Sequence, residues 1–418
     1  MKDIKIAENI KYIGVDDKTI DLFENQYILK NGMSYNSYLI LDDKIVIMDT
    51  VDKRKTDEWL NNLENALNGK KPDYLVISHL EPDHSGSIGA VLKKYPEMKI
   101  ISNEKVFAFL PQFIDLDEIY KKKNLNSKEK ISDKNQEDNN NEKPEALKWL
   151  EDKKVVVKEG DTINIGRHTL QFIMAPMVHW PEVMMTYEQT EKILFSADAF
   201  GKFGTLDTGE PWIDEARRYF INIVGKYGIQ VQSVLKKAAN LDIKTICALH
   251  GPILKENLGY YINLYDTWSK YEPEEDGILV VCGSLHGNTF EVAQKFAKDL
   301  EAKGNTVKLV DIARTPVPDV VADAFKYSKM CIACATYNMS IFPAMYNFLH
   351  LLVEKNYQNR KIGIIENGSW APNAANVIKG MLANQKKLEI LEPVVTIRTK
   401  LNKESEVKMK ELEDVFTK

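Results

Sequence analysis

The stretch that decides the fold spans residues 74–89 and reads YLVISHLEPDHSGSIG. An apolar run is followed by closely spaced metal-ligand types and then by small residues, which is typical of a strand, a loop and a helix start. The ligand types are His79, Glu81, Asp83 and His84. Residues two apart on an extended chain point the same way, so His79 and Glu81 can reach one ion. Pro82 constrains the backbone locally, and we expect Asp83 and His84 to face a second ion.

Two imidazoles and two carboxylates form a mixed nitrogen and oxygen donor set. Such a set suits iron, manganese or zinc and argues against a soft thiolate site. A lone histidine beside an acid is more often a surface residue or a satisfied core pair. Four ligand types in one short segment at the end of an apolar strand favour metal binding instead.

Length and composition exclude several classes of protein. The chain has 418 residues, enough for two or three domains of about 100–200 residues each. The net charge of −5 gives no nucleic-acid footprint, and no apolar run reaches the roughly 18 residues of a membrane span. No signal-peptide core is visible at the N-terminus, and four cysteines form no disulfide scaffold. We therefore expect a cytoplasmic protein with no nucleic-acid or membrane partner.

The first domain is predicted to span residues 1–266, with short strands early in the chain and a helical stretch around 213–240. Residues 121–148 are almost entirely Lys, Asn, Glu, Asp and Ser, apart from a possible helix at 145–150. Such a composition buries too little apolar surface to offset its ordering entropy, which predicts a flexible surface insertion. Residues 267–277 are a charged stretch and form the predicted linker.

The second domain, residues 278–418, shows strict strand and helix alternation. Strands are expected at 278–282, 306–311, 329–335, 361–365 and 391–397. Crossover helices between them predict a parallel sheet covered on both faces. Cys331 and Cys334 have redox-motif spacing, but they lie inside an apolar strand rather than at a helix N-terminus, so we interpret them as core residues.

Three more ligand types end apolar strands of the first domain, namely His179, Asp198 and His250. Seven ligands are too many for one ion with an open position and suit two ions that share a bridge. Asp198 is the natural bridge because a carboxylate has two oxygens. His168 follows no strand and His350 lies in a helical run, so we interpret both as structural.

The order H-x-E-x-D-H, then a strand-end His, Asp and His, resembles flavodiiron proteins, also called A-type flavoproteins. The stretches YNSYLI at 35–40 and FSADAFG at 195–201 are further family-like features. The resemblance implies an α/β chain in which a metallo-β-lactamase-like αββα sandwich precedes a flavodoxin-like, doubly wound five-stranded parallel sheet. Hydrolases of the superfamily usually show H-x-H-x-D-H and bind zinc, so Glu81 shifts the site toward oxygen ligation and redox iron.

The same resemblance implies how the ligands are divided. It implies that one iron is held by His79, Glu81 and His179. It implies that the other is held by Asp83, His84 and His250. Asp198 would bridge them, and Tyr219 matches a family stretch near the site, which makes it a candidate catalytic residue.

A flavin site is expected at three strand ends of the second domain. The first loop resembles a phosphate cradle before a helix N-terminus and comprises Ser284, Leu285, His286, Gly287, Asn288 and Thr289. The two later loops contribute Thr336, Tyr337, Asn338, Gly368, Ser369 and Trp370. The family usually has G-S-Y-G-W in the last loop, so Tyr337 and Trp370 both remain candidates for stacking on the flavin ring. No G-x-G-x-x-G with a paired acid supports a nicotinamide site.

The resemblance implies an oxidoreductase in which FMN passes electrons from a rubredoxin-like carrier to two non-haem irons. The irons would reduce O2 to water, NO to N2O, or both. No cysteine lies beyond residue 400, so we expect the donor to be a separate protein. The linker is short and each site lies at the strand ends of its own sheet, so we expect a head-to-tail homodimer or a dimer of dimers.

Two other classes of function remain as alternatives. A zinc hydrolase fused to a flavodoxin domain is disfavoured by Glu81, and metal analysis would decide. A pure electron carrier is disfavoured by seven intact ligands, and consumption of gas by the reduced protein would decide.

Overall fold

The computed structural model describes residues 4, 6–126 and 144–417. These residues divide into two compact units, one of Met1–Ala216 with Ser233–Tyr261 and the other of Arg217–Gln232 with Ile262–Lys418. Residues 217–232 lie inside the predicted first domain, yet they pack with the second unit. Among the helices of the described residues, none is long and apolar enough to cross a membrane.

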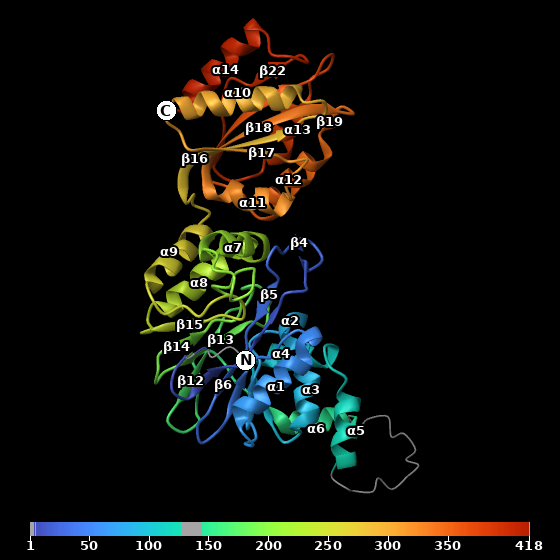
Figure 1. The fold of residues 1–418 in the computed structure, drawn as a ribbon, viewed down its shortest axis with the longest axis vertical. Coiled ribbons are helices and arrows are strands. Elements are labelled where there is room, and N and C mark those ends of the chain that lie inside the picture. The colour runs from blue at the N-terminus through green and yellow to red at the C-terminus, as the bar shows by residue number, and fades with distance from the viewer. Residues whose placement is uncertain (1–3, 5, 127–143, 418) are drawn as a thin grey trace. The chain divides into compact units, whose positions relative to one another are not determined.

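Two mixed sheets form the centre of the first unit (Figure 1). The first sheet has the order β1 (Ile10–Tyr12), β6 (Tyr38–Ile40), β7 (Val46–Met48), β8 (Tyr74–Val76), β9 (Lys99–Ser102) and β10 (Lys154–Val156). The second has the order β11 (Thr162–Asn164), β12 (Thr169–Met174), β13 (Met184–Glu188), β14 (Ile193–Phe195) and β15 (Thr245–Cys247). Two short ribbons pair β2 (Val15–Asp17) with β5 (Met33–Tyr35) and β3 (Leu22–Phe23) with β4 (Tyr27–Ile28).

The two sheets pack face to face through one apolar core. Tyr38, Met48 and Val76 of the first sheet share this core with Phe172 and Phe195 of the second. The alternate residues of the first sheet, such as Leu39, Ile47 and Leu75, point to its other face and are also fully buried. Helices therefore cover that face, which gives the predicted sandwich of two sheets between helices.

Helices of the first unit follow the apolar spacing of their sequence. In α1 (Thr56–Leu67) the buried positions include Trp59, Leu63 and Leu67, which recur every four residues and form one stripe. The helix ends at Asn68, whose φ of 47° is the left-handed conformation of a C-terminal cap. The other helices on this side are α3 (Ile88–Lys94), α4 (Glu104–Phe109), α5 (Leu116–Asn126) and α6 (Glu145–Lys153).

Several boundaries differ from the expectations. The strand β13 was not predicted, because all five of its residues are buried and its polar and apolar residues do not alternate. Residues 121–126 were expected to be part of a flexible insertion but continue α5, while residues 127–143 lie outside the described part of the chain. The segment between the domains is shorter than the predicted linker 267–277. The first residues of that linker belong to α9 (Leu258–Ser269), and its last residues belong to β16 (Glu275–Gly283).

The helical stretch expected around 213–240 is divided into several segments. It consists of α7 (Trp212–Tyr219), the π-helical η3 (Phe220–Val224), the short η4 (Gly225–Tyr227) and α8 (Gly228–Ala238). Single π-helical turns of this kind occur often at functional sites.

The second unit is built on a parallel sheet with the order β17 (Val307–Asp311), β16, β18 (Tyr327–Tyr337), β20 (Arg360–Asn367) and β21 (Leu388–Ile390). The fifth strand, expected at 391–397, is replaced by two short strands that both pair with β20, namely β21 before the expected range and β22 (Val395–Ile397) at its end. Helices lie on both faces (Figure 1), namely α10 (Asn288–Ala302), α11 (Val317–Lys326), α12 (Pro343–Glu354), α13 (Ala374–Leu382) and α14 (Lys403–Phe416). Cys331 and Cys334 are buried free thiols inside β18, and burial raises the pKa of Cys334 to about 12.

Candidate metal centre and flavin pocket

The seven predicted metal ligands come from loops and one short helix that follow strands of both sheets of the first unit. His79 follows β8, whereas His179, Asp198 and His250 follow β12, β14 and β15 of the second sheet. The structure brings all seven together in two adjoining groups. The groups are His79 with Glu81, His179 and Asp198, and Asp83 with His84 and His250.

The short helix α2 (Pro82–Ser85) begins between the two pairs of ligands in the H-x-E-x-D-H stretch and carries the second pair. Pro82 occupies its first position, where a missing N–H costs nothing, and Asp83 and His84 project from it. A Cβ at Gly86, just after the helix, would lie only 2.5 Å from the backbone nitrogen of Lys53. Glycine is therefore needed for the turn that leads out of the ligand stretch.

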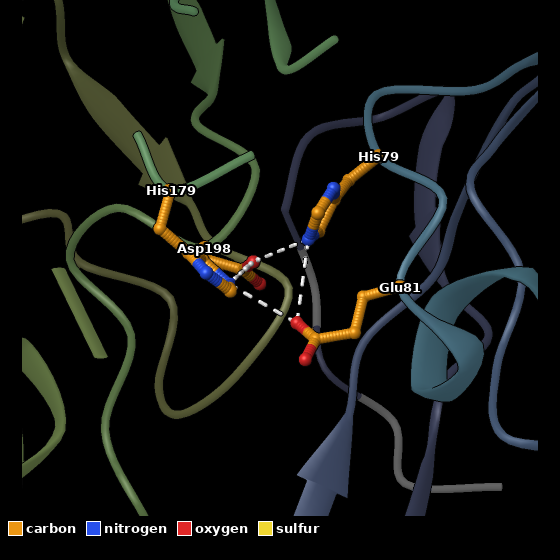
Figure 2. Close-up of side chains that lie close together, drawn as sticks. All are labelled: His79, Glu81, His179 and Asp198. Atoms are coloured by element: carbon orange, nitrogen blue, oxygen red, sulfur yellow. Dashed lines mark hydrogen bonds and ion pairs between the residues drawn. The ribbon is translucent and has the colours of Figure 1, made fainter. Parts of the chain in front are cut away.

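The first group has the spacing of atoms around one ion (Figure 2). The Nε2 atom of His179 lies 3.1 Å from Glu81 Oε2 and 3.3 Å from Asp198 Oδ2. The Nε2 atom of His79 lies 3.3 and 3.4 Å from the same two oxygens. Two donors about 2.1 Å from one ion are about 3.0–3.4 Å apart in octahedral or tetrahedral geometry. The four side chains can therefore close on a single cation.

The second group shares Asp198 with the first. His84 Nε2 lies 3.3 Å from Asp83 Oδ2 and 3.0 Å from Asp198 Oδ1. His250 Nε2 lies 3.1 Å from the same oxygen of Asp83 and 3.7 Å from Asp198 Oδ1. Because Oδ2 of Asp198 faces one group and Oδ1 faces the other, this carboxylate has the geometry of a bridge between two ions.

Burial provides a test of whether this site fits metal ions. The side-chain oxygens of Asp83 and Asp198 and the Nε2 atom of His84 are buried, and none makes a hydrogen bond of good geometry with the described residues. A buried carboxylate without such a partner is costly, whereas a coordinated cation removes the cost. The donor set and its unsatisfied atoms therefore fit a pair of divalent ions.

Outer hydrogen bonds orient two of the imidazoles. The Nδ1 atom of His79 lies 3.0 Å from Oε1 of Glu182, which also accepts the backbone N–H of Leu80 at 3.1 Å. The Nδ1 atom of His250 lies 2.7 Å from the backbone oxygen of Ser34. Each contact places the proton on Nδ1 and leaves Nε2 free for a metal. Glu182 was not among the predicted site residues, because it is 103 residues from His79 in the sequence and no local spacing indicates the contact.

Charges within the site oppose the effect of burial on its titrating groups. Burial alone would lower the pKa of His84 and His179, but nearby carboxylates raise each pKa to about 9. Burial would raise the pKa of Asp198, but the surrounding imidazoles hold it well below its usual value. Without a metal, the positive charge of protonated imidazoles thus balances the negative charge of the carboxylates. A bound cation replaces these protons, so metal binding releases protons.

A small pocket adjoins the ligands. It has a volume of about 280 Å³, and its lining includes Leu22, Phe23, Tyr35, Glu81 and Asp83. The hairpin β3–β4 forms one wall. Its three-residue turn, residues 24–26, includes Glu24 and Asn25 with φ values of 48° and 57°, the positive φ that tight hairpin turns require.

Aromatic rings from this wall support the second ligand group. The rings of Phe23 and Tyr35 meet the His250 imidazole edge-on, with centroids 5.7 and 5.9 Å away. Arg54 donates a hydrogen bond to the Tyr35 hydroxyl at 3.0 Å. The pocket therefore combines an aromatic side with an ionic side at the ligands.

The predicted flavin residues surround a pocket of about 500 Å³ in the second unit. Of the twelve, only Gly287 is not part of its lining. Gly287 precedes α10 with a φ of 91° and donates its N–H to Ser284 Oγ at 3.1 Å. The lining also includes Met339, Asn367 and Ala371 from the two later loops, and two residues outside the three predicted loops, Ala335 and Thr399.

This pocket fits a flavin mononucleotide. Its volume is within the range of about 300–1,000 Å³ typical of sites for small ligands. The N-terminus of α10 meets its edge and offers backbone N–H groups for a phosphate. Trp370 and Tyr337 are 87% and 42% exposed, so either ring is accessible for stacking.

His168, His350 and Tyr219 are not members of the two metal-ligand groups or of the flavin-pocket lining. His168 is fully buried and its Nδ1 lies 2.9 Å from Glu188, and His350 is an exposed residue of α12. Tyr219 is fully buried at the end of α7 and belongs to the second unit, so its catalytic role stays a prediction.

Comparisons with known proteins agree with this architecture. A family described as ODP family beta lactamase matches residues 33–251, just over half of the chain. An uncharacterized protein of Methanocaldococcus jannaschii is 30% identical over 83% of this chain and 80% of its own. An anaerobic nitric oxide reductase flavorubredoxin of Aliivibrio salmonicida is 27% identical over 91% of this chain and 72% of its own. The solved rubredoxin oxygen:oxidoreductase of Desulfovibrio gigas shares the fold, with a TM-score of 0.82, 22% identity, and coverage of 99% and 97%.

Together, the fold and the two sites define an oxidoreductase that joins a metallo-β-lactamase-like unit to a flavodoxin-like unit. The chain belongs to the flavodiiron protein family.

Proposed function

We propose that this chain uses FMN and two non-haem irons to reduce O2 to water, NO to N2O, or both. The observation that carries the proposal is the position of Asp198, whose two oxygens face two separate groups of ligands. A single zinc would leave one of these groups without a cation. The mixed donor set also suits iron, which supplies the redox chemistry when bound.

Different residues of the chain would bind each of the two irons. His79, Glu81 and His179 would hold one iron, and Asp83, His84 and His250 the other, with Asp198 between them. Glu182 fixes the tautomer of His79, and the backbone oxygen of Ser34 does so for His250. These contacts keep the ligands in place while the charge of the centre changes.

The pocket beside the ligands supports a very small substrate. Its volume of about 280 Å³ lies just below the range typical of drug-sized ligands, and Leu22 and Phe23 give it an apolar wall. A diatomic gas fits such a site. The relatives' names point to both gases, nitric oxide for the flavorubredoxin and oxygen for the rubredoxin oxidoreductase.

Electrons would enter through FMN in the pocket of the second unit, from a rubredoxin-like carrier as the relatives' names suggest. We further infer that the active unit is a head-to-tail homodimer or a dimer of dimers, in which one chain's flavin faces the other's irons. A mixture of the iron-deficient His84→Ala variant and a flavin-deficient variant changed at Ser284 and Thr289 should regain activity in heterodimers. Heterodimers that form without regaining activity would place electron transfer within one chain.

Metal analysis and anaerobic kinetics test the proposal. Protein made with iron available should hold about two irons and one FMN per chain, and its reduced form should consume O2 or NO. Both gases should be compared side by side, because the same ligands serve either reaction. One zinc per chain with hydrolase activity would favour the zinc hydrolase, and two irons without gas consumption would favour a pure electron carrier.

A further inference from the structure

A strained turn borders the flavin pocket just after β22. The backbone N–H of Lys400 donates to the oxygen of Arg398 at 2.9 Å, and Thr399 between them has a φ of 69°. This is a γ-turn of the rare positive-φ kind. A β-branched residue seldom adopts such a φ, and strain of this sort persists only where the surroundings impose it, often at functional sites.

The surroundings of Thr399 are residues of the flavin pocket. Its N–H donates to Asn367 Oδ1 at 3.0 Å, and its backbone oxygen accepts from Asn367 Nδ2 at 3.1 Å. Its hydroxyl lies 2.7 Å from the hydroxyl of Ser369. Asn367 also donates to Thr289 Oγ1 at 3.2 Å, so one network joins the turn to two of the predicted flavin loops.

The loop after β20 depends on this turn for its anchoring. Gly368 donates its N–H to the Ile397 oxygen at 3.0 Å, and Arg398 donates to the Ser369 oxygen at 3.4 Å. With the Thr399 contact, the hydrogen bonds that residues 368–370 make within the described chain all go to residues 397–399. Trp370, which could stack on the flavin, is otherwise 87% exposed.

We propose that the turn at residues 398–400 is a fourth flavin-binding segment, and that Thr399 is a positioning residue that holds the 368–370 loop in its flavin-binding conformation. The inference rests on the proposed function, because it concerns the FMN that the pocket would bind. The strain at Thr399 is compensated by the bonds to Asn367 and Ser369, and these bonds reduce the freedom that the loop would lose when FMN binds.

The test measures FMN binding to deflavinated protein by flavin fluorescence. Thr399→Val keeps the branched shape and removes the hydroxyl, and Ser369→Ala removes the same bond from the other side. Each single substitution should weaken FMN binding about tenfold. The double variant should bind FMN as well as either single variant does, because all three variants lose the same hydrogen bond. Thr399→Ser should bind within about twofold of wild type, and Thr417→Val, near the C-terminus, is the matched control.

A purely structural role for Thr399 would lower the melting temperature of the deflavinated protein without this shared loss of FMN affinity. Wild-type affinity in Thr399→Val, or additive losses in the double variant, would overturn the inference. If Thr399→Val does not fold, the FMN affinity of Ser369→Ala can be compared with that of Ser369→Thr, which keeps the hydroxyl. Wild-type protein that binds no FMN would overturn the proposed function itself, whereas unchanged variants overturn the positioning role alone.

Discussion

Replacing Glu182 with Gln should weaken iron binding without unfolding the protein. Glu182 is buried, and its Oε1 atom faces the His79 Nδ1 and accepts the N–H of Leu80, at 3.0 and 3.1 Å. A hydrogen bond to a charged group is worth about 1.5–3 kcal/mol and a neutral one about 0.5–1.5 kcal/mol. The amide keeps the shape and loses the charge, so about 1–1.5 kcal/mol should be lost, which is about a fivefold to tenfold loss of affinity.

The chain offers a matched control for this change. Glu188 is a second buried carboxylate that lies 2.9 Å from the Nδ1 of a histidine, His168, at the other end of β13. Anaerobic titration of ferrous iron against a competing chelator should show weaker binding for Glu182→Gln and wild-type binding for Glu188→Gln. Equal affinities in the two variants would refute the idea that Glu182 tunes His79 as a ligand.

Three further changes have definite expected results. Asp198→Ala should lose both irons and keep FMN, measured as metal and flavin content, because each oxygen of Asp198 faces one ligand group; two retained irons would exclude the bridge. Deleting residues 122–143 should leave activity and melting nearly unchanged, because a segment of such polar composition has little apolar surface to bury; a large loss of activity would indicate a docking role. The hydrogen bond to Glu188 raises the pKa of His168. Protonated His168 therefore stabilises the folded protein fully below the unfolded pKa of about 6.5, and this stabilisation is lost as pH rises through the folded pKa. Urea unfolding of wild type and His168→Gln should therefore differ most near pH 6 and converge toward pH 9, and a constant difference would contradict this.

Local patterns in the sequence were enough to find the residues of the metal groups. Each candidate follows an apolar strand, and strand ends of a layered fold gather at one edge, so His179, Asp198 and His250 could be expected beside the first four. The structure places all seven in two groups. The alternation of strands and helices after residue 278 was likewise enough to predict the parallel sheet.

Contacts that depend on distant parts of the chain were not predictable in this way. Glu182 meets His79 across 103 residues, and no local spacing marks that pairing. Thr399 has no flavin-type motif, and its role follows only from the turn that brings it to Asn367 and Ser369. By contrast, the break between β21 and β22 in the sheet of the second unit has a local signal, because Pro393 lies in it and cannot donate to a strand ladder.

The most direct test of the central claim is Mössbauer spectroscopy of protein reconstituted anaerobically with iron, together with its iron content. A centre bridged by Asp198 predicts about two irons per chain, whose spins are magnetically coupled in the oxidised protein. A single uncoupled iron per chain, or a site that keeps zinc when iron is supplied, would contradict the account.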